Sequence, residues 1–192
     1  MNAKPHPDGT PTLHLIGPDP ELPARAEGLL TAAEREALAL YTFPKRRRDW
    51  LLGRLAGKEA LSRATGGDWQ PEAITVSRHE SGGPDFSGPD GRLAGWRLSI
   101  SHGHGLAAGL ATPEPSGVDL ELFRAVEPGG WRFFLTEEER KWLEGEPLGA
   151  QGEILVWALK EAAYKAIRGS VRSVLELPVR EAGGGRAVLD SP

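Results

Sequence analysis

The sequence predicts an α+β fold of two mixed halves, because its strand and helix patterns are clustered and do not alternate as in βαβ units. A proline-rich segment at residues 112–116 is the best candidate for a linker, and divides the chain into residues 1–112 and 113–192. No internal repeat is evident. Strands are expected at residues 12–16, 74–78, 97–101, 106–111, 117–122, 171–178 and 186–189.

Capping patterns and apolar periodicity predict the helices. Thr31 and Thr136 each begin a Thr-x-x-Glu capping box, the usual signature of a helix N-terminus. Apolar residues recur at helical spacing over residues 44–64 and 153–168, and a shorter helical turn is expected over residues 131–134.

Composition excludes several classes of protein. The 192 residues carry a net charge of −4, which disfavours a general nucleic-acid binder, and the absence of cysteine excludes disulfides and thiolate metal sites. No apolar run reaches about 18 residues, and the N-terminus lacks the apolar core of a signal peptide. We therefore expect a soluble cytoplasmic protein that binds no membrane.

Asp119 and Glu121 are the first candidate site. On a strand over residues 117–122 both side chains would lie on one face, where two carboxylates repel each other unless a cation separates them. Mg²⁺ prefers carboxylate oxygens and commonly binds one or two of them together with substrate phosphates. The alternative is a solvated strand face with two ordinary acids.

Trp157, Glu161 and Lys165 are spaced by four residues and share one stripe of the predicted helix. A carboxylate beside an ammonium group there could hold a metal and a phosphate together. The alternatives are an ordinary Glu–Lys surface pair and a tryptophan that belongs to the core.

Basic and histidine-containing segments are candidates for binding an anion. His102 follows a strand in a Ser-His-Gly-His-Gly segment, whose glycines would let backbone N–H groups approach a phosphate. A basic run at residues 45–48 is followed by Arg54 and Lys58. The segment at 53–58 is one residue short of a phosphate-binding loop, lies within a predicted helix, and is rejected as such a loop. A solvated helix face and an exposed turn are the alternatives.

In combination these motifs resemble the phosphopantetheinyl transferase superfamily, in its larger, monomeric class typified by the surfactin-synthetase-activating enzymes. The likeness covers about residues 30–170. The matching features, in order, are a basic helix with Leu-Leu-Gly-Arg, a Ser-His pair, Gly-Val-Asp-Leu-Glu, Arg-Phe-Phe followed by acids, and Trp-x-x-Lys-Glu-Ala-x-x-Lys.

The resemblance implies two similar α+β halves related by pseudo-twofold symmetry. It implies transfer of the 4′-phosphopantetheine arm of coenzyme A to a serine of an acidic acyl or peptidyl carrier protein, with release of 3′,5′-ADP. The cofactor would be Mg²⁺ or Mn²⁺, and the enzyme would be a monomer that binds no nucleic acid.

The resemblance also assigns roles to residues. Asp119, Glu121 and Glu161 would bind the metal, Glu161 or Glu138 would help to deprotonate the carrier serine, and Lys165 would hold the pyrophosphate. The expected coenzyme A contacts are Ser101, His102, Lys160, Lys165, Arg48, Arg54 and Lys58.

Three departures from the family pattern keep other functions open. Leu-Ser-Ile at residues 98–100 replaces the stretch that commonly carries an Asn, Gly-Gly-Pro at 82–84 replaces Gly-Lys-Pro, and Ala158 replaces a Ser or Thr. The alternatives are an inactive homologue, a non-enzymatic anion- or nucleic-acid-binding module, and a different magnesium-dependent phosphotransferase or phosphodiesterase.

Overall fold

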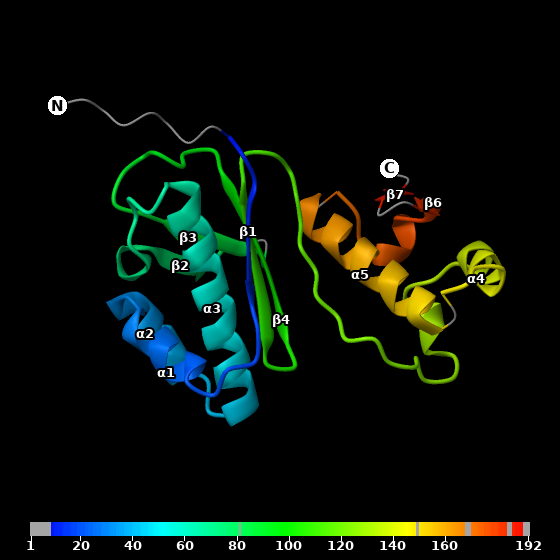
Figure 1. Ribbon diagram of the computed structural model, residues 1–192, viewed down its shortest axis with the longest axis horizontal. Helices are drawn as coiled ribbons and strands as arrows, with labels where there is room; N and C mark the ends of the chain where they lie inside the picture. Colours follow the sequence, from blue (N-terminus) through cyan, green and yellow to red (C-terminus); the bar gives the residue numbers. More distant parts are fainter. Residues whose placement is uncertain (1–8, 81, 149, 168–169, 184–185, 190–192) are drawn as a thin grey trace. The chain divides into compact units, whose positions relative to one another are not determined.

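The computed structural model describes residues 9–80, 82–148, 150–167, 170–183 and 186–189 (Figure 1). The chain forms two compact units, Met1–Leu120 and Glu121–Pro192. The division between them lies eight residues beyond the boundary expected after residue 112. Both units contain helices and strands, which confirms the α+β class. No helix within the described ranges is both long and apolar enough to span a membrane.

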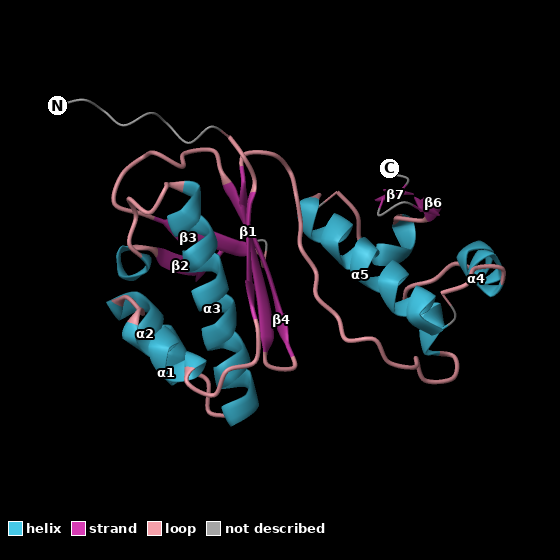
Figure 2. Cartoon of the chain, viewed as in Figure 1, coloured by secondary structure: helices cyan, strands magenta, loops and turns pink. Residues whose placement is uncertain are grey.

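The first unit is built on an antiparallel three-stranded sheet with the strand order β1-β5-β4 (Figure 2). These strands are β1 (Thr12–Ile16), β4 (Arg97–Gly103) and β5 (Leu106–Thr112). Helices α1 (Leu22–Gly28), α2 (Ala32–Ala39) and α3 (Pro44–Ala64) precede the short 3-10 helix η1 (Pro71–Ala73) and the hairpin of β2 (Thr75–Arg78) and β3 (Pro84–Ser87). Helix α1 and strand β3 were not predicted from the sequence.

Glycines allow α3 to pack directly against the sheet. A Cβ atom at Gly109 of β5 would collide with the backbone carbonyl of Ala56, and one at Gly57 would lie 2.9 Å from Ile100 Cδ1. Bringing a helix backbone this close to a strand requires a residue without a side chain. The glycines of the segment 53–58 therefore serve helix–sheet packing, which agrees with the rejection of a phosphate-binding loop.

The second unit contains η2 (Gly130–Phe133), α4 (Glu137–Glu144), α5 (Ala150–Ala166) and η3 (Val174–Glu176), followed by the hairpin of β6 (Val179–Gly183) and β7 (Arg186–Leu189). Its core gathers apolar side chains from the loop after η2 and from α4, α5, η3 and β6: Phe134, Leu135, Leu143, Val156, Val174 and Val179. The predicted strand at 171–178 is wrong, because this stretch holds η3, and β6 begins only at Val179. The predicted end of α5 at Arg168 lies outside the described residues.

The predicted strand at residues 117–122 is also wrong, since this segment has no regular secondary structure. Its backbone N–H groups at Val118 and Leu120 donate to serine side chains of β4, so they form no ladder with backbone carbonyls. An alternation of apolar and acidic residues was therefore mistaken for strand pairing.

A buried ion pair joins the elements of the first unit. Glu34, in the first turn of α2, accepts hydrogen bonds from the N–H groups of Thr31 (2.9 Å) and Val76 (2.9 Å). Its carboxylate lies 2.7 Å from the ammonium of Lys58, and the two side chains are only 2% and 1% exposed. Lys58 Nζ also donates to the carbonyl of Leu29, at 3.0 Å. The pair thereby links α2, α3 and β2.

The second unit contains the same arrangement. Glu139, in the first turn of α4, accepts from the N–H groups of Thr136 (2.7 Å) and Val179 (2.7 Å). The ammonium of Lys160 lies 2.6 Å from this carboxylate and donates to the carbonyl of Phe134 at 2.8 Å. We call each of these pairs, with its capping threonine and strand valine, a Lys–Glu clamp.

The two Lys–Glu clamps reveal an internal repeat that the sequence analysis missed. Residues 30–38 and 135–143 share the pattern Leu-Thr-x-x-Glu-Arg-x-x-Leu, and Lys-Glu-Ala occurs at 58–60 and at 160–162. In both units a 3-10 helix begins five residues before the valine that donates to the glutamate. The two units thus contain a related helix–helix–hairpin motif, whereas a pseudo-twofold relation between them stays a prediction.

Candidate functional site

Two serines of β4 hold the segment that carries Asp119. Ser101 Oγ donates to Asp119 Oδ1 at 2.9 Å and accepts from the N–H of Leu120 at 3.2 Å. Two residues earlier on the strand, Ser99 Oγ accepts from the N–H of Val118 at 3.1 Å. Both serines are buried, and Asp119 is half-buried. The Asp119 carboxylate is therefore oriented by the end of β4.

Glu121 is held by a different donor, in the second unit. The indole N–H of Trp157 on α5 donates to Glu121 Oε1 at 3.0 Å. The same indole packs edge-to-face against Phe134, with ring centroids 5.2 Å apart. Trp157 thus belongs to the core and also orients a candidate metal ligand, two roles that the sequence analysis had treated as alternatives.

Glu161 and Lys165 follow Trp157 along the same stripe of α5, at intervals of four residues, and both are half-buried. A carboxylate and an ammonium therefore lie on one helix face close to the residue that holds Glu121. Glu138 is exposed in the first turn of α4, where it is accessible to a partner protein.

The described part of the chain contains no preformed cluster of three or more His, Cys, Asp or Glu side chains that could hold a metal ion. The chemistry of the predicted ligands nevertheless fits a hard divalent cation, because Asp119, Glu121 and Glu161 offer carboxylate oxygens. Asp119 and Glu121 each accept a hydrogen bond from a neutral donor, as carboxylates that ligate metals usually do.

Two of the lysines that were expected to contact coenzyme A take part in buried ion pairs instead. Lys58 and Lys160 are fully buried, and their ammonium groups are held within the Lys–Glu clamps by carboxylates and backbone carbonyls. Burial lowers the pKa of Lys58, and the hydrogen bond that its ammonium donates to Glu34 opposes this effect only in part. In this structure neither lysine can reach a phosphate, so neither is retained as a ligand contact.

The arginines of α3 differ in their surroundings. Arg48 is exposed, whereas the guanidinium of Arg54 stacks on the ring of Trp50, 4.4 Å from its centroid. Burial lowers the pKa of Arg54, and the nearby negative charge of Glu34 partly offsets this effect. Arginine keeps its charge in proteins, so both side chains remain suitable for an anion.

His102 is exposed at the end of β4, and its ring lies beside Gly53 of α3. A Cβ atom at Gly53 would lie 2.6 Å from His102 Cδ2, so the glycine makes room for the imidazole. His104 and Gly105 both have positive φ, at 55° and 78°, and form the two-residue turn that joins β4 to β5. Gly105 is therefore explained by the hairpin, without a bound anion.

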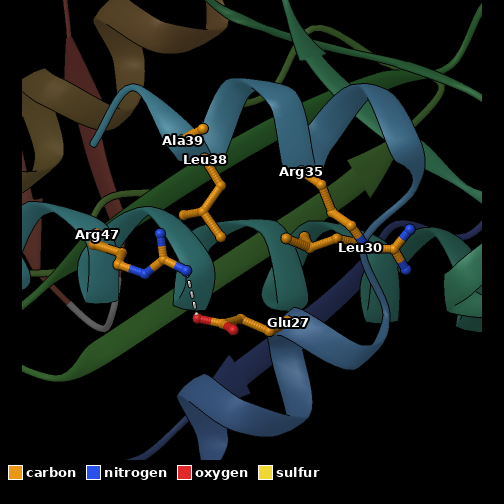
Figure 3. Close-up of a pocket in the computed structure, with 6 residues that line it drawn as sticks. All are labelled: Glu27, Leu30, Arg35, Leu38, Ala39 and Arg47. Atoms are coloured by element: carbon orange, nitrogen blue, oxygen red, sulfur yellow. Dashed lines mark hydrogen bonds and ion pairs between the residues drawn. The ribbon is translucent and has the colours of Figure 1, made fainter. Parts of the chain in front are cut away.

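A separate depression of about 270 Å³ lies between α1, α2 and α3 (Figure 3). Leu30 and Leu38 form its apolar part, and Arg47 at its edge pairs with Glu27 at 2.8 Å. Arg47, from the basic run at residues 45–48, lines this depression, but Asp119, Glu121, Glu161 and Lys165 do not. It is thus distinct from the candidate site around Asp119.

Sequence reasoning missed the hydrogen bonds that Ser99 and Trp157 make near the candidate ligands, and the position of Gly53 beside His102. A signal was present for the first two: Ser-x-Ser on a strand places two hydroxyls on one face, and the tryptophan shares its helix stripe with Glu161. Nothing in the sequence indicated that Gly53 lies beside His102.

Comparison with known proteins agrees with the superfamily suggested by the motifs. Residues 115–185 match the model of the 4′-phosphopantetheinyl transferase superfamily. This segment contains Asp119, Glu121, Glu161 and Lys165. No curated protein matches the chain significantly.

Among solved structures, 31 chains match. One is a holo-(acyl-carrier-protein) synthase from Bacillus anthracis str. Ames in complex with CoA (3′,5′-ADP), 24% identical, with 54% of this chain and 93% of that chain covered and a TM-score of 0.42. Another is the Helicobacter pylori holo-[acyl-carrier-protein] synthase in complex with coenzyme A, 19% identical, with 54% and 98% covered and a TM-score of 0.35.

Proposed function

We propose that this protein transfers the 4′-phosphopantetheine arm of coenzyme A to a serine of an acyl or peptidyl carrier protein. The observation that carries the proposal is the match of residues 115–185 to the 4′-phosphopantetheinyl transferase superfamily. Both acid-containing motifs lie inside that segment. The products are the holo-carrier protein and 3′,5′-ADP.

In this proposal Asp119, Glu121 and Glu161 hold a Mg²⁺ or Mn²⁺ ion. When bound, such an ion binds the pyrophosphate of coenzyme A and offsets the negative charge that builds as its bond breaks. The hydrogen bonds from Ser101 and Trp157 support this assignment, since they orient two of the three carboxylates.

The side chains of the protein perform the remaining steps. Lys165 binds the pyrophosphate and stabilises the leaving 3′,5′-ADP. Glu161 or Glu138 accepts the proton of the carrier serine, directly or through a water, as the hydroxyl oxygen forms a bond to the β-phosphorus. The bond from that phosphorus to the oxygen bridging the two phosphates breaks, and its electron pair leaves with 3′,5′-ADP.

We propose fewer contacts to coenzyme A than the sequence suggested. His102, Arg48 and Arg54 remain candidates, because one imidazole and two guanidinium groups suit the nucleotide phosphates. We no longer assign Lys58 and Lys160 to coenzyme A, because their ammonium groups belong to the Lys–Glu clamps.

We also propose that the chain belongs to the larger, monomeric class with two similar halves. The repeated Lys–Glu clamp supports this assignment, because a duplicated half would carry the same buried pair twice. When the Lys-Glu-Ala triplets at 58–60 and 160–162 are superposed in sequence, Glu59 corresponds to Glu161, and Arg63 of α3 corresponds to Lys165 of α5.

The test is intact-mass spectrometry of acidic carrier proteins after incubation with coenzyme A, Mg²⁺ and this protein. We expect the mass of the phosphopantetheine arm to appear on the carrier serine and to disappear with Asp119→Ala or Lys165→Ala. Asp85→Ala and Lys141→Ala, which change exposed residues of β3 and α4, are the matched controls.

Full transfer by both Asp119→Ala and Lys165→Ala would refute the site. Absence of transfer with every carrier, together with oligonucleotide binding that needs no Mg²⁺ and weakens steeply with salt, would instead favour a non-enzymatic module.

A further inference from the structure

The face of β4 that carries Ser99 and Ser101 is the face turned away from α3. Leu98 and Ile100, which alternate with the serines, approach Gly57 of α3, so the strand directs its serines to the opposite side. Ser99 is 1% and Ser101 is 8% exposed. These two hydroxyls hold the backbone of residues 118–120 to β4.

The two serines make different contacts with this segment. Ser99 is bonded to the backbone N–H of Val118, whereas Ser101 binds both the backbone N–H of Leu120 and the carboxylate of Asp119. A serine hydroxyl has one proton and two lone pairs. Because a lone pair of Ser101 takes the N–H of Leu120, its proton is directed at Asp119 Oδ1.

We propose that Ser101 is a positioning residue, whose hydroxyl fixes the Asp119 carboxylate in the orientation that binds a divalent cation. The inference rests on the proposed function, because it takes Asp119 as a metal ligand. It also changes the role of Ser101, which the sequence had placed among the contacts to coenzyme A. Partners that orient a metal ligand typically contribute about ten- to a hundredfold to metal affinity.

Ser99 provides a matched control within the same strand. Ser99→Ala removes a buried hydroxyl and one anchor of the segment but leaves the bond between Ser101 and Asp119 in place. A merely structural role for Ser101 predicts that Ser99→Ala and Ser101→Ala have similar effects. A positioning role predicts that only Ser101→Ala changes the affinity for the cation.

The experiment measures Mn²⁺ binding to the full chain by electron paramagnetic resonance, in the presence of coenzyme A. We expect Ser101→Ala to weaken Mn²⁺ binding by about tenfold or more, Ser101→Thr to retain most of the affinity, and Ser99→Ala to match the wild type. If Ser101→Ala does not fold, Ser101→Cys takes its place, because it replaces the hydroxyl by a weak donor of similar shape; we expect it also to weaken Mn²⁺ binding.

Unchanged Mn²⁺ affinity in the Ser101 variants, equal losses in Ser99→Ala and Ser101→Ala, or no Mn²⁺ binding by the wild type would overturn the inference. Carrier modification is measured separately on the same proteins. A wild type that transfers the arm while Ser101→Ala binds Mn²⁺ normally would refute the inference and leave the function intact. If Ser101→Ala binds Mn²⁺ more weakly but the wild type transfers no arm to any carrier, the inference about Ser101 is supported and the proposed function is refuted.

Discussion

Replacing Glu139 by glutamine tests how strongly the buried ammonium of Lys160 depends on its counter-charge. The side chains of this pair are 0% and 2% exposed, and the two charged atoms lie 2.6 Å apart. Glutamine keeps the shape of Glu139 and an oxygen for the N–H of Val179, but it removes the charge. Lys160 would then retain the carbonyl of Phe134 as a partner without any compensating charge.

The expected loss is large because the pair is fully desolvated. Breaking a buried ion pair by removing one partner typically costs about 3–5 kcal/mol. This is a substantial share of the roughly 5–15 kcal/mol by which a domain is stable. Replacing both charges with groups of similar shape, in Glu139→Gln/Lys160→Met, should recover most of the loss, because well-packed apolar replacements of buried pairs are often neutral.

The assay is urea unfolding combined with hydrogen exchange of peptides from α4 and α5. Glu137→Gln, at an exposed position of the same helical turn, is the control and should change the free energy of unfolding by less than about 0.5 kcal/mol. A decrease of less than about 1 kcal/mol in the free energy of unfolding of Glu139→Gln would refute the reasoning, because a buried ammonium without its counter-ion should destabilise the fold by more than this.

Three further substitutions test individual contacts. Gly53→Ala would place a Cβ atom 2.6 Å from His102 Cδ2; we expect the displaced imidazole to raise the KM for coenzyme A about tenfold, and an unchanged KM would contradict its role. Burial lowers the pKa of His14 from its usual 6.5, so the unfolded chain binds more protons as the pH falls below that value and stability decreases. Urea unfolding over this acidic range should show a shallower decline for His14→Gln, and an identical decline would exclude His14 as a source. Trp157→Phe removes the donor to Glu121 but keeps an aromatic ring, and should raise the half-saturating Mg²⁺ concentration about tenfold in the transfer assay; the same Mg²⁺ dependence as the wild type would show that the indole bond is dispensable.

The helices were predictable because their signals are local. Thr31 and Thr136 were recognised as N-caps, and α2 and α4 begin at the next residue in each case. Capping depends on residues within one turn, so a short window of sequence contains the whole interaction. The long helices α3 and α5 followed from apolar spacing for the same reason.

The segment at 117–122 and the two buried lysines were harder to predict because their partners are distant in the chain. Ser99 and Ser101 replace a neighbouring strand as the partners of the segment, and an alternating pattern does not specify which groups accept its N–H bonds. Lys58 and Lys160 were expected to contact coenzyme A, because a lysine is almost never fully buried without a partner. Their glutamates lie more than 20 residues away in sequence.

The internal repeat escaped notice because so few residues carry it. Outside the capping boxes and the Lys-Glu-Ala triplets, the two units have little sequence in common, since a surface position can change freely while one member of a buried ion pair cannot be replaced without its partner. The candidate metal ligands were found from their motifs, but the donors that orient them became visible only with the fold.

The Lys–Glu clamps give each unit its own internal reporter of opening. The side chains of Lys58 and Lys160 are 1% and 0% exposed, whereas that of Lys45 is 71% exposed. An amine-reactive reagent therefore labels Lys45 in the native protein and reaches the clamp lysines only when α2 or α4 detaches. Acylation of Lys58 without Lys160 would show that the first unit opens first, and acylation of Lys160 without Lys58 would show that the second unit does.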